Sequence, residues 1–318
     1  VAPFAMGDRL ALLALLVRPF ELVGFQGNVF TWMMISTIVA LPAAIVAGFQ
    51  FPALIALAGR GGRHVGSDVG RVYAFNTIGA IAGSLAGGFG LMPLLTATGC
   101  WKLCGWLMVG LCAAAVFISA QRRTPPIAGP AFALVAAALL VVASGPSAAW
   151  RHVPIGAGRA TLTATNANEL IDWQRRHRSS IVMQADGVES SVALWGDDGY
   201  AFVVNGKSDG HAVSDAATQV MGGLVGAILH PHPKRSLVVG LGTGSTAGWI
   251  GKVAGMERVA VAELEPEIRN VARACAAVNQ NVLDQPNVHV FYGDAREMLL
   301  VTRERYDIIF SEPSNPYR

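Results

Sequence analysis

The chain has 318 residues, of which 53% are hydrophobic and only 14% charged, and its formal net charge is +3. A mean hydropathy of +0.44 is unusually high for a soluble protein and indicates a membrane. The small net charge gives no reason to expect nucleic-acid binding. The four cysteines have neither CxxC spacing nor metal-ligand spacing with the seven histidines, so we expect neither a disulfide nor a metal site.

Apolar residues are concentrated in residues 1–150, which we interpret as a transmembrane helical region of about four or five segments. A helix needs about 20 apolar residues to cross the hydrocarbon core of a bilayer. Three stretches approach or exceed this length, namely residues 31–58, 101–120 and 127–145.

Two further stretches are weaker candidates for membrane spans. In residues 72–97, Gly79, Gly83 and Gly87 recur at every fourth position. Small residues at this spacing allow membrane helices to approach closely, so this face is predicted to pack on another helix. Residues 10–27 are interrupted by charged side chains and a proline, and fit either a span with a buried ion pair or an interfacial segment.

Residues 151–234 have a mixed polar and apolar sequence, which we interpret as a small β-element and a connecting helix. Residues 192–195 and 200–204 flank a Gly-Asp-Asp-Gly sequence, and this arrangement predicts a β-hairpin. Residues 216–229 have a helical pattern, which the following His-Pro-His-Pro sequence would end.

Residues 235–318 alternate between short apolar runs and helical patterns. Strands are expected at residues 236–240, 257–263, 287–292 and 306–310. Such alternation implies parallel strands joined by right-handed crossovers, so an α/β Rossmann-like domain is predicted. A complete sheet of this kind has further strands, and we expect the domain to be incomplete at the C-terminus.

Two features at the ends of the first two expected strands suggest a nucleotide-like ligand. Gly240, Gly242 and Gly244 precede a helix, where the lack of side chains lets backbone N–H groups approach a ligand. Residues 242–247 also fit the G-x-G-x-x-A pattern of dinucleotide-binding enzymes, and a tight turn without a ligand is a further interpretation. Glu263 ends the second strand, where a carboxylate can accept hydrogen bonds from both hydroxyls of a ribose.

Polar residues also follow the third and fourth expected strands. Asp294, which precedes Ala295, can accept a hydrogen bond from the exocyclic amine of adenine, as is typical of proteins that bind an adenosyl sulfonium. The alternative is an N-cap for the helix at residues 295–301, and one side chain can do both. Glu312 and Asn315 lie in a proline-rich segment at the carboxyl edge of the sheet, where ligands bind.

In their order and spacing, these motifs over residues 187–318 resemble the spermidine synthase (polyamine aminopropyltransferase) family, whose domain is of the S-adenosylmethionine methyltransferase type. Residues 51–99 contain a proline, an Arg-rich loop and the sequence Tyr-x-x-Asn-Thr-x-Gly. They resemble the membrane portion of bacterial proteins that fuse transporter-like helices to such a domain. The resemblance implies a membrane-bound transferase that moves an aminopropyl group from decarboxylated S-adenosylmethionine to an amine acceptor in polyamine biosynthesis.

The resemblance also assigns expected roles to single residues. The positions that would bind the sulfonium cofactor are Gly240, Gly242, Gly244, Glu263, Asp294 and Ala295. Glu312 falls where the family has its catalytic Asp, and would position the acceptor ammonium and help to remove its proton. Asn315 and Asp215 are the candidate substrate-binding residues, and no metal is implied.

The chain departs from the family at the acceptor side. Asn315 stands where the family has a second Asp, and Thr218 and Gln219 stand where it has a Tyr-His pair. Asp209 and Asp215 would supply replacement charges, unless they are a turn residue and a helix N-cap. An S-adenosylmethionine-dependent methyltransferase and a non-catalytic polyamine-binding or transport protein are therefore alternatives.

The expected partners are a small-molecule amine, the lipid bilayer and, in a homo-oligomer, further copies of the chain. The Arg-rich loops at residues 60–71 and 121–123 both favour the cytoplasm, which would place the residues after 145 outside the cell. A nucleotide-derived sulfonium is made inside the cell, which argues the opposite. We expect a protein of the bacterial inner membrane with a cytoplasmic catalytic domain.

Overall fold

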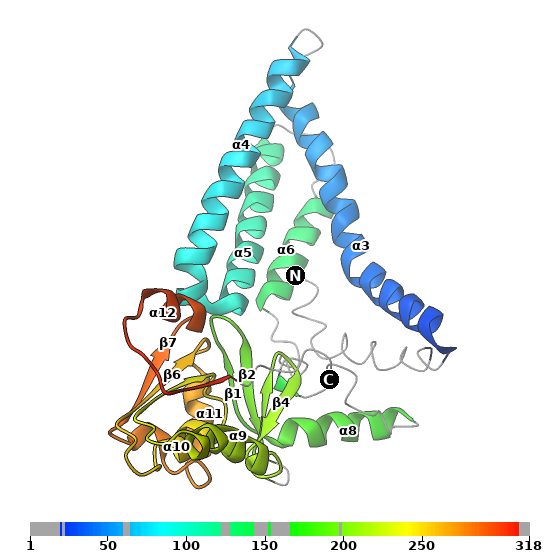
Figure 1. The fold of residues 1–318 in the computed structure, drawn as a ribbon. Coiled ribbons are helices and arrows are strands. Elements are labelled where there is room, and N and C mark those ends of the chain that lie inside the picture. The colour runs from blue at the N-terminus through cyan, green and yellow to red at the C-terminus, as the bar shows by residue number, and fades with distance from the viewer. Residues whose placement is uncertain are drawn as a thin grey trace. The chain divides into compact units, whose positions relative to one another are not determined.

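The computed structural model describes residues 20, 23–59, 64–121, 128–142, 152–153, 166–196 and 199–311. The chain divides into two compact units, Val1–Ser144 and Gly145–Arg318, and each is described by itself. Figure 1 shows that the described residues of the first unit form only helices, whereas the described strands all belong to the second unit.

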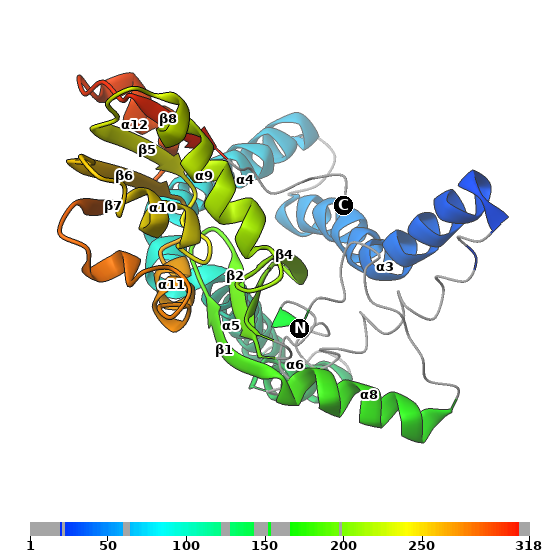
Figure 2. The same ribbon diagram turned by 60° about the horizontal axis from the view of Figure 1, so that its bottom comes forward.

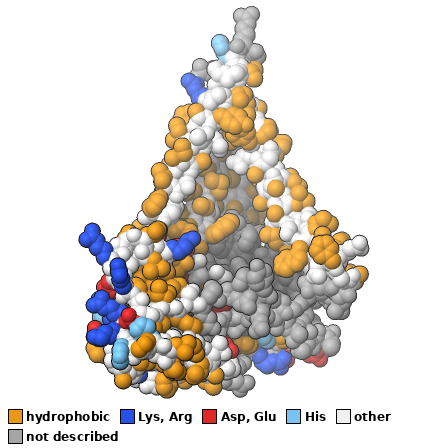
Figure 3. Space-filling model, viewed as in Figure 1, with side chains coloured by type: hydrophobic (Ala, Val, Ile, Leu, Met, Phe, Trp, Pro, Cys, Tyr) orange, Lys and Arg blue, Asp and Glu red, His pale blue; other side chains and the backbone are white. Residues whose placement is uncertain are grey.

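The described part of the first unit is a set of apolar helices. Their bounds are α3 at Phe25–Ala58, α4 at Val65–Ala86, the π-helix η2 at Gly87–Leu91, α5 at Met92–Gln121 and α6 at Ala128–Val142. Two helical stretches, Phe25–Ala58 and Val65–Gln121, are long and apolar enough to cross a membrane, as judged by length and composition. Large side chains such as Phe25 and Phe49 are 82% and 77% exposed, and hydrophobic groups cover the visible faces of these helices (Figure 3).

The helix bounds can be compared with the expected spans of this unit. The expected span at residues 127–145 overlaps α6, of which the structure describes 15 residues, and residues 127 and 143–145 lie outside the described part of the chain. The two segments at residues 72–97 and 101–120 lie in one helical run, which is interrupted at Thr96, a residue with φ 59° and ψ 174°. Most of residues 10–27 lie outside the described residues.

The expected packing of the glycine stripe is not found among the described residues. A Cβ atom built at Gly79, Gly83 or Gly87 would have no atom within 4 Å. A close helix contact occurs instead at Gly105 of α5, where a Cβ atom would lie 3.1 Å from a methyl group of Val141 in α6. Small residues allow close approach, but the stripe alone does not determine which helices meet.

The second unit begins with a helix and an antiparallel sheet. The elements are α8 at Ala167–Ser179, β1 at Ile181–Asp186, β2 at Ser191–Trp195, β3 at Ala201–Val204 and β4 at Lys207–His211. The strands pair in the order β1-β2-β3-β4, and the segments expected to form a hairpin are the central pair. Asn205 and Gly206, with φ of 50° and 76°, join β3 to β4, as an Asn-Gly sequence favours in a two-residue hairpin turn.

The rest of the second unit is a parallel sheet with its helices. The elements are α9 at Ala216–Leu229, β5 at Arg235–Val239, α10 at Ser245–Ile250, β6 at Arg258–Glu263, α11 at Ile268–Ala274, the short 3₁₀-helix η3 at Val282–Asp284, β7 at Val288–Tyr292, α12 at Ala295–Val301 and β8 at Ile308–Ser311. The strand order is β7-β6-β5-β8, and each pairing is parallel. The prediction of a Rossmann-like domain is confirmed, as is the helix at residues 216–229.

The core of the second unit lies on both faces of the parallel sheet (Figure 2). Val238 and Val261 face α9, α10 and α11 on one side, in a cluster that also includes Leu194 of β2. Leu237 and Ala260 face α12 on the other side. Because alternate residues of a strand point to opposite faces, continuously apolar strands are buried on both sides. The order of the strands reverses between β5 and β8, and ligands of such sheets bind at this point.

Candidate active site

The loop after β5 takes a backbone conformation that glycine favours. Gly240, Gly242 and Gly244 have φ of 93°, 52° and 81°. A Cβ atom at Gly240 would have nothing within 4 Å, so the requirement there is conformational, whereas at Gly244 it would also lie 2.9 Å from the amide nitrogen of Asn279. These three residues therefore shape the turn that enters α10, as the sequence predicts.

Glu263 ends β6 and is only 8% exposed. Its Oε2 accepts a 2.7 Å hydrogen bond from the backbone N–H of Leu241, and its Oε1 accepts a 2.9 Å bond from that of Glu265. The carboxylate thus ties the glycine loop to the end of β6. Each carboxylate oxygen has a second lone pair, so these two bonds leave acceptor capacity for a ligand.

Asp294 lies close to Glu263 along the edge of the sheet, because Gly293 donates its N–H to the backbone carbonyl of Glu263 at 2.8 Å. Asp294 is the N-cap of α12 and accepts a 2.8 Å bond from the N–H of Arg296, whose guanidinium also contacts the carboxylate at 2.6 Å. The Arg296 side chain, and then its backbone N–H, lower the pKa of Asp294. The capping role is observed, and the ionised carboxylate can act only as an acceptor.

A cavity of about 330 Å³ lies beside these acidic residues. Its walls come from the ends of β6 and β7 and from α12, and are formed by Ala262, Phe291, Tyr292, Gly293, Asp294, Glu297, Met298 and Val301. Burial raises the pKa of Tyr292. Largely apolar walls with two acidic side chains, Asp294 and Glu297, and a volume near the lower end of small-molecule pockets suit a flat heterocycle such as a purine.

The start of α9 contacts the tip of the glycine loop. The hydroxyl group of Thr243 donates to Oε1 of Gln219 at 2.5 Å, and that of Thr246 donates to the Gln219 backbone carbonyl at 2.9 Å. Gln219, which stands where the family has the second residue of a Tyr-His pair, therefore contacts the glycine loop and the start of α10 through neutral hydrogen bonds.

The two acidic residues proposed as replacement charges are engaged elsewhere. Asp209 forms a 3.1 Å ion pair with Lys207, and the two side chains are only 15% and 20% exposed. Asp215 accepts a 2.8 Å bond from the N–H of His211 in the turn before α9. It stands at the N-cap position without a capping bond from its side chain. The side chain of Asp215 thus contacts the turn before α9 and does not cap the helix, and its role toward an acceptor stays a prediction.

Glu312 and Asn315, the candidate residues for the acceptor side, lie outside the described residues. The last residue of β8, Ser311, pairs with Val239, which directly precedes the glycine loop. The structure thus brings together Glu263, Asp294 and the three glycines, and the roles of all site residues stay predictions.

Asn279 supports the site but was not identified from the sequence. It is fully buried, and its Nδ2 donates to the backbone carbonyls of Thr243 at 2.8 Å and Ala272 at 2.6 Å. Its Oδ1 accepts from the N–H of Val282 at 3.2 Å. No spacing rule indicates such a residue, because its partner in the glycine loop is 36 positions away.

No family model matches the chain. It is 28% identical over 294 residues to polyamine aminopropyltransferase 2 of Streptomyces coelicolor, an alignment that covers 87% of this chain and 48% of that protein. It is 32% identical over 92 residues to the polyamine aminopropyltransferase of Nitrosomonas europaea, covering 29% and 28%. Spermidine synthase of Dictyostelium discoideum is 31% identical over 87 residues, covering 27% and 31%. The chain spans half or less of the length of these relatives.

Solved structures that resemble the chain include spermidine synthase from Thermotoga maritima, with a TM-score of 0.39 and 18% identity over 43% of this chain and 48% of that one. A probable spermidine synthase from Corynebacterium glutamicum has a TM-score of 0.33 and 21% identity, covering 41% and 50%.

Proposed function

We propose that this homologue of the polyamine aminopropyltransferases moves an aminopropyl group from decarboxylated S-adenosylmethionine to an amine acceptor, a step of polyamine biosynthesis. The observation that carries the proposal is the position of Glu263. Its buried carboxylate accepts from the glycine loop and lies one strand from Asp294, so the sheet edge offers two anionic acceptors beside a purine-sized cavity.

In this proposal the sulfonium substrate lies along the carboxyl edge of β5, β6 and β7. The loop of Gly240, Gly242 and Gly244 admits its nucleoside at close range. Glu263 accepts from the ribose hydroxyls with its remaining lone pairs, as a carboxylate at this place in such sheets can do. Asp294, next to Ala295, accepts from the adenine amine after its exposed partner Arg296 swings aside.

The reaction is a nucleophilic substitution at carbon. The acceptor's free amine attacks the aminopropyl carbon bonded to the sulfonium sulfur, a new C–N bond forms, the C–S bond breaks, and methylthioadenosine leaves with the bonding electrons. The attacking nitrogen loses a proton to the carboxylate of Glu312, the proposed general base. Asn315 and Asp215 would orient the acceptor, and orientation of the two reactants supplies much of the rate.

Methyl transfer from S-adenosylmethionine is the second candidate, and one observation favours it. The ion pair of Asp209 with Lys207 offsets one of the negative charges that would attract a diamine. The nucleoside-binding residues would be the same in both reactions. A domain that binds polyamines without catalysis is the remaining alternative.

The by-product distinguishes these functions. The full chain in detergent is incubated with decarboxylated S-adenosylmethionine or S-adenosylmethionine and a panel of amines, including putrescine. Methylthioadenosine that depends on the amine supports aminopropyl transfer. S-adenosylhomocysteine supports methyl transfer, and binding of a polyamine without either product supports a binding protein.

We also propose that residues 1–150 anchor the protein in the bacterial inner membrane, with residues 151–234 forming a cytoplasmic β-element and residues 235–318 a cytoplasmic catalytic domain. The apolar length of α3 supports this. The full chain should sediment with membranes, resist extraction by high salt and be released by detergent. Release by salt alone would contradict the proposal. The mass of the protein in the protein–detergent complex, without the mass of the bound detergent, would test for a homo-oligomer.

A further inference from the structure

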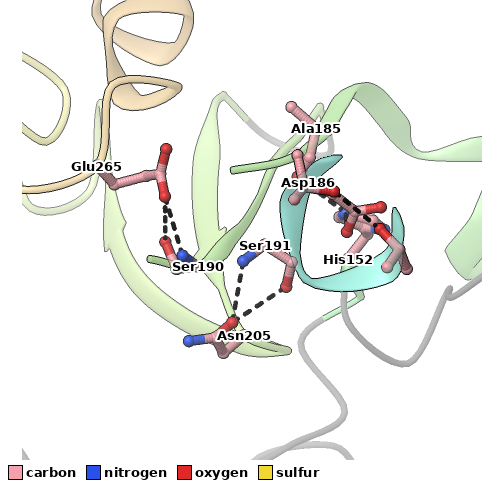
Figure 4. A network of polar contacts seen from close by, with 9 residues as sticks. His152, Ala185, Asp186, Ser190, Ser191, Asn205 and Glu265 are labelled. Carbon is pink, nitrogen blue, oxygen red and sulfur yellow. Dashed lines mark hydrogen bonds and ion pairs between the residues drawn. The ribbon is translucent and has the colours of Figure 1, made fainter. Parts of the chain in front are cut away.

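The turn between β1 and β2, residues 187–190, contacts the loop that follows β6 (Figure 4). The contact is made by Glu265, which is only 4% exposed and lies two residues beyond Glu263. Its Oε2 accepts hydrogen bonds from the backbone N–H groups of Glu189 and Ser190, both at 2.9 Å. Its Oε1 accepts from the N–H of Glu267 at 3.0 Å. Three backbone donors therefore fix one buried carboxylate.

The turn is shaped to receive this carboxylate. A Cβ atom at Gly187 would overlap the carboxyl group of Glu265, so a residue with a side chain does not fit there without displacing it. The backbone of Gly187 closes the turn by donating its N–H to the carbonyl of Ser190 at 2.8 Å. The requirement for glycine is spatial, because Gly187 does not have a positive φ.

The same turn is also braced on its own sheet. The N–H of Ser191 donates to Oδ1 of Asn205 at 3.0 Å, and the N–H of Asn205 donates to the carbonyl of Ser191 at 2.9 Å. Asn205 thus holds the end of the turn to the β3–β4 hairpin, and Glu265 holds its middle to the parallel sheet.

Glu265 is linked in turn to the proposed ribose-binding residue. Its backbone N–H donates to Oε1 of Glu263 at 2.9 Å, while Oε2 of Glu263 accepts from Leu241 in the glycine loop. One short segment, residues 263–265, therefore holds the glycine loop with one carboxylate and the β1–β2 turn with the next. The two sheets are therefore joined directly beside the proposed ribose-binding residue.

We propose that Glu265 is a positioning residue that fixes the β1–β2 turn to the segment directly after Glu263 and thereby couples the antiparallel sheet to binding of the sulfonium substrate. This inference rests on the proposed function. Loss of the Glu265 carboxylate frees the β1–β2 turn from the loop after β6. It also removes one constraint on the backbone of Glu265, whose N–H donates to the Glu263 carboxylate. The affinity for the nucleoside then falls, while the chemical step, which takes place at the β5–β8 edge, is unchanged.

The test compares Glu265→Gln with Ser190→Ala in the full chain in detergent. Glutamine has the same shape but turns a donating NH₂ group toward backbone donors. Ser190→Ala is the matched control, because it removes only a hydroxyl group 3.5 Å from the carboxylate and leaves the backbone donor in place. Amide hydrogen exchange of Glu189 and Ser190 without ligand reports the turn, and calorimetric titration with methylthioadenosine reports the site.

In Glu265→Gln we expect faster exchange at both amides and an affinity for methylthioadenosine that is roughly 10- to 100-fold lower. The KM for the sulfonium substrate should rise by a similar factor, with kcat and the acceptor's KM unchanged. Ser190→Ala should match the wild type. If Glu265→Gln does not fold, Gly187→Ala, which pushes the carboxylate out of the turn, must give the same result.

Unchanged exchange, or faster exchange with unchanged affinity, would overturn the inference. A fall in kcat without a change in the sulfonium KM would do so as well, since it would mean a general loss of active structure. Failure of the proposed function can be distinguished from failure of this inference, because measurements on the wild-type chain are enough to detect it. A wild-type chain that binds no sulfonium nucleoside and no methylthioadenosine removes both the proposed function and this inference.

Discussion

Replacing Glu263 with glutamine separates the structural and ligand-binding roles of this carboxylate. In the structure both of its oxygens accept from buried backbone N–H groups, those of Leu241 and Glu265. Glutamine has one accepting oxygen and one NH₂ group that can only donate. One of the two backbone donors will therefore face another donor, and the ribose will meet a neutral group in place of an anion.

The magnitudes follow from these contacts. A buried donor left without an acceptor costs about 1–3 kcal/mol, so the free energy of unfolding should fall by that amount. Hydrogen bonds to a charged group contribute about 1.5–3 kcal/mol, so the affinity for methylthioadenosine should fall roughly 10- to 150-fold. Replacement by alanine should cost more stability than replacement by glutamine, because both backbone donors lose their acceptor.

The assay is calorimetric titration of the full chain with methylthioadenosine, together with thermal unfolding without ligand. Glu267→Gln is the matched control, because it neutralises a carboxylate in the same loop that accepts from the side chain of Asn270 at 2.9 Å in an exposed position. The control should keep wild-type affinity and stability. If Glu263→Gln loses stability but binds methylthioadenosine as the wild type does, Glu263 is only a structural brace.

Four other substitutions test other parts of the chain. Glu312→Gln should lower turnover by roughly 10²- to 10⁴-fold in the by-product assay, the typical effect of losing a general base, while Asn315→Asp should lower the KM for putrescine. Full turnover in Glu312→Gln would exclude the carboxylate from the chemistry. Asn279→Ala should lower the free energy of unfolding by about 2–4 kcal/mol, because buried groups lose their partners, and wild-type thermal stability would contradict this. Hydrogen bonds from two backbone N–H groups at the start of β5 lower the pKa of Asp307 from its usual 3.8. The ionised Asp307 therefore stabilises the fold at pH values above 3.8, and this stabilisation is lost as the pH falls through the lowered pKa. Thermal unfolding between pH 6 and about 2 should therefore show a weaker acid destabilisation in Asp307→Asn, and equal slopes would refute the assignment.

The parallel sheet could be predicted from the sequence because its strands are buried on both faces. Such strands appear as continuous apolar runs, and the expected run at residues 257–263 differs from β6 by one residue. The bounds of α9 were predicted because prolines follow it directly. The position of Glu263 at the edge of the sheet follows from the end of the apolar run.

The flanking strands β1 and β4 were missed because they lack this signal. The sequence of β4, Lys-Ser-Asp-Gly-His, has no apolar alternation, and pairing with β3 through the Asn205–Gly206 turn is what makes it a strand. The Asn-Gly sequence at residues 205–206 was the one feature of the sequence that indicated a further strand after β3, because it favours a hairpin turn. Tertiary pairing here overrides weak local preference.

The supporting contacts of the site could not be predicted from spacing. The bond from Ser190 to Glu265 joins residues 75 positions apart, and only the packing of the two sheets brings them together. The sequence shows a second acidic residue, Glu265, shortly after the end of β6, but it does not indicate that its partners lie in the β1–β2 turn.

The pairing of β5 with β8 determines the order in which the second unit can fold. The start of β8 contacts that of β5 across 72 residues, whereas β5, β6 and β7 are each joined by a shorter connection. During synthesis β5 leaves the ribosome well before β8, and its open edge must stay unpaired in the meantime. The crevice at the reversal point of the strand order therefore forms only after β8 has been made. A nucleoside that binds in this crevice therefore cannot stabilise the chain during the earlier steps of folding.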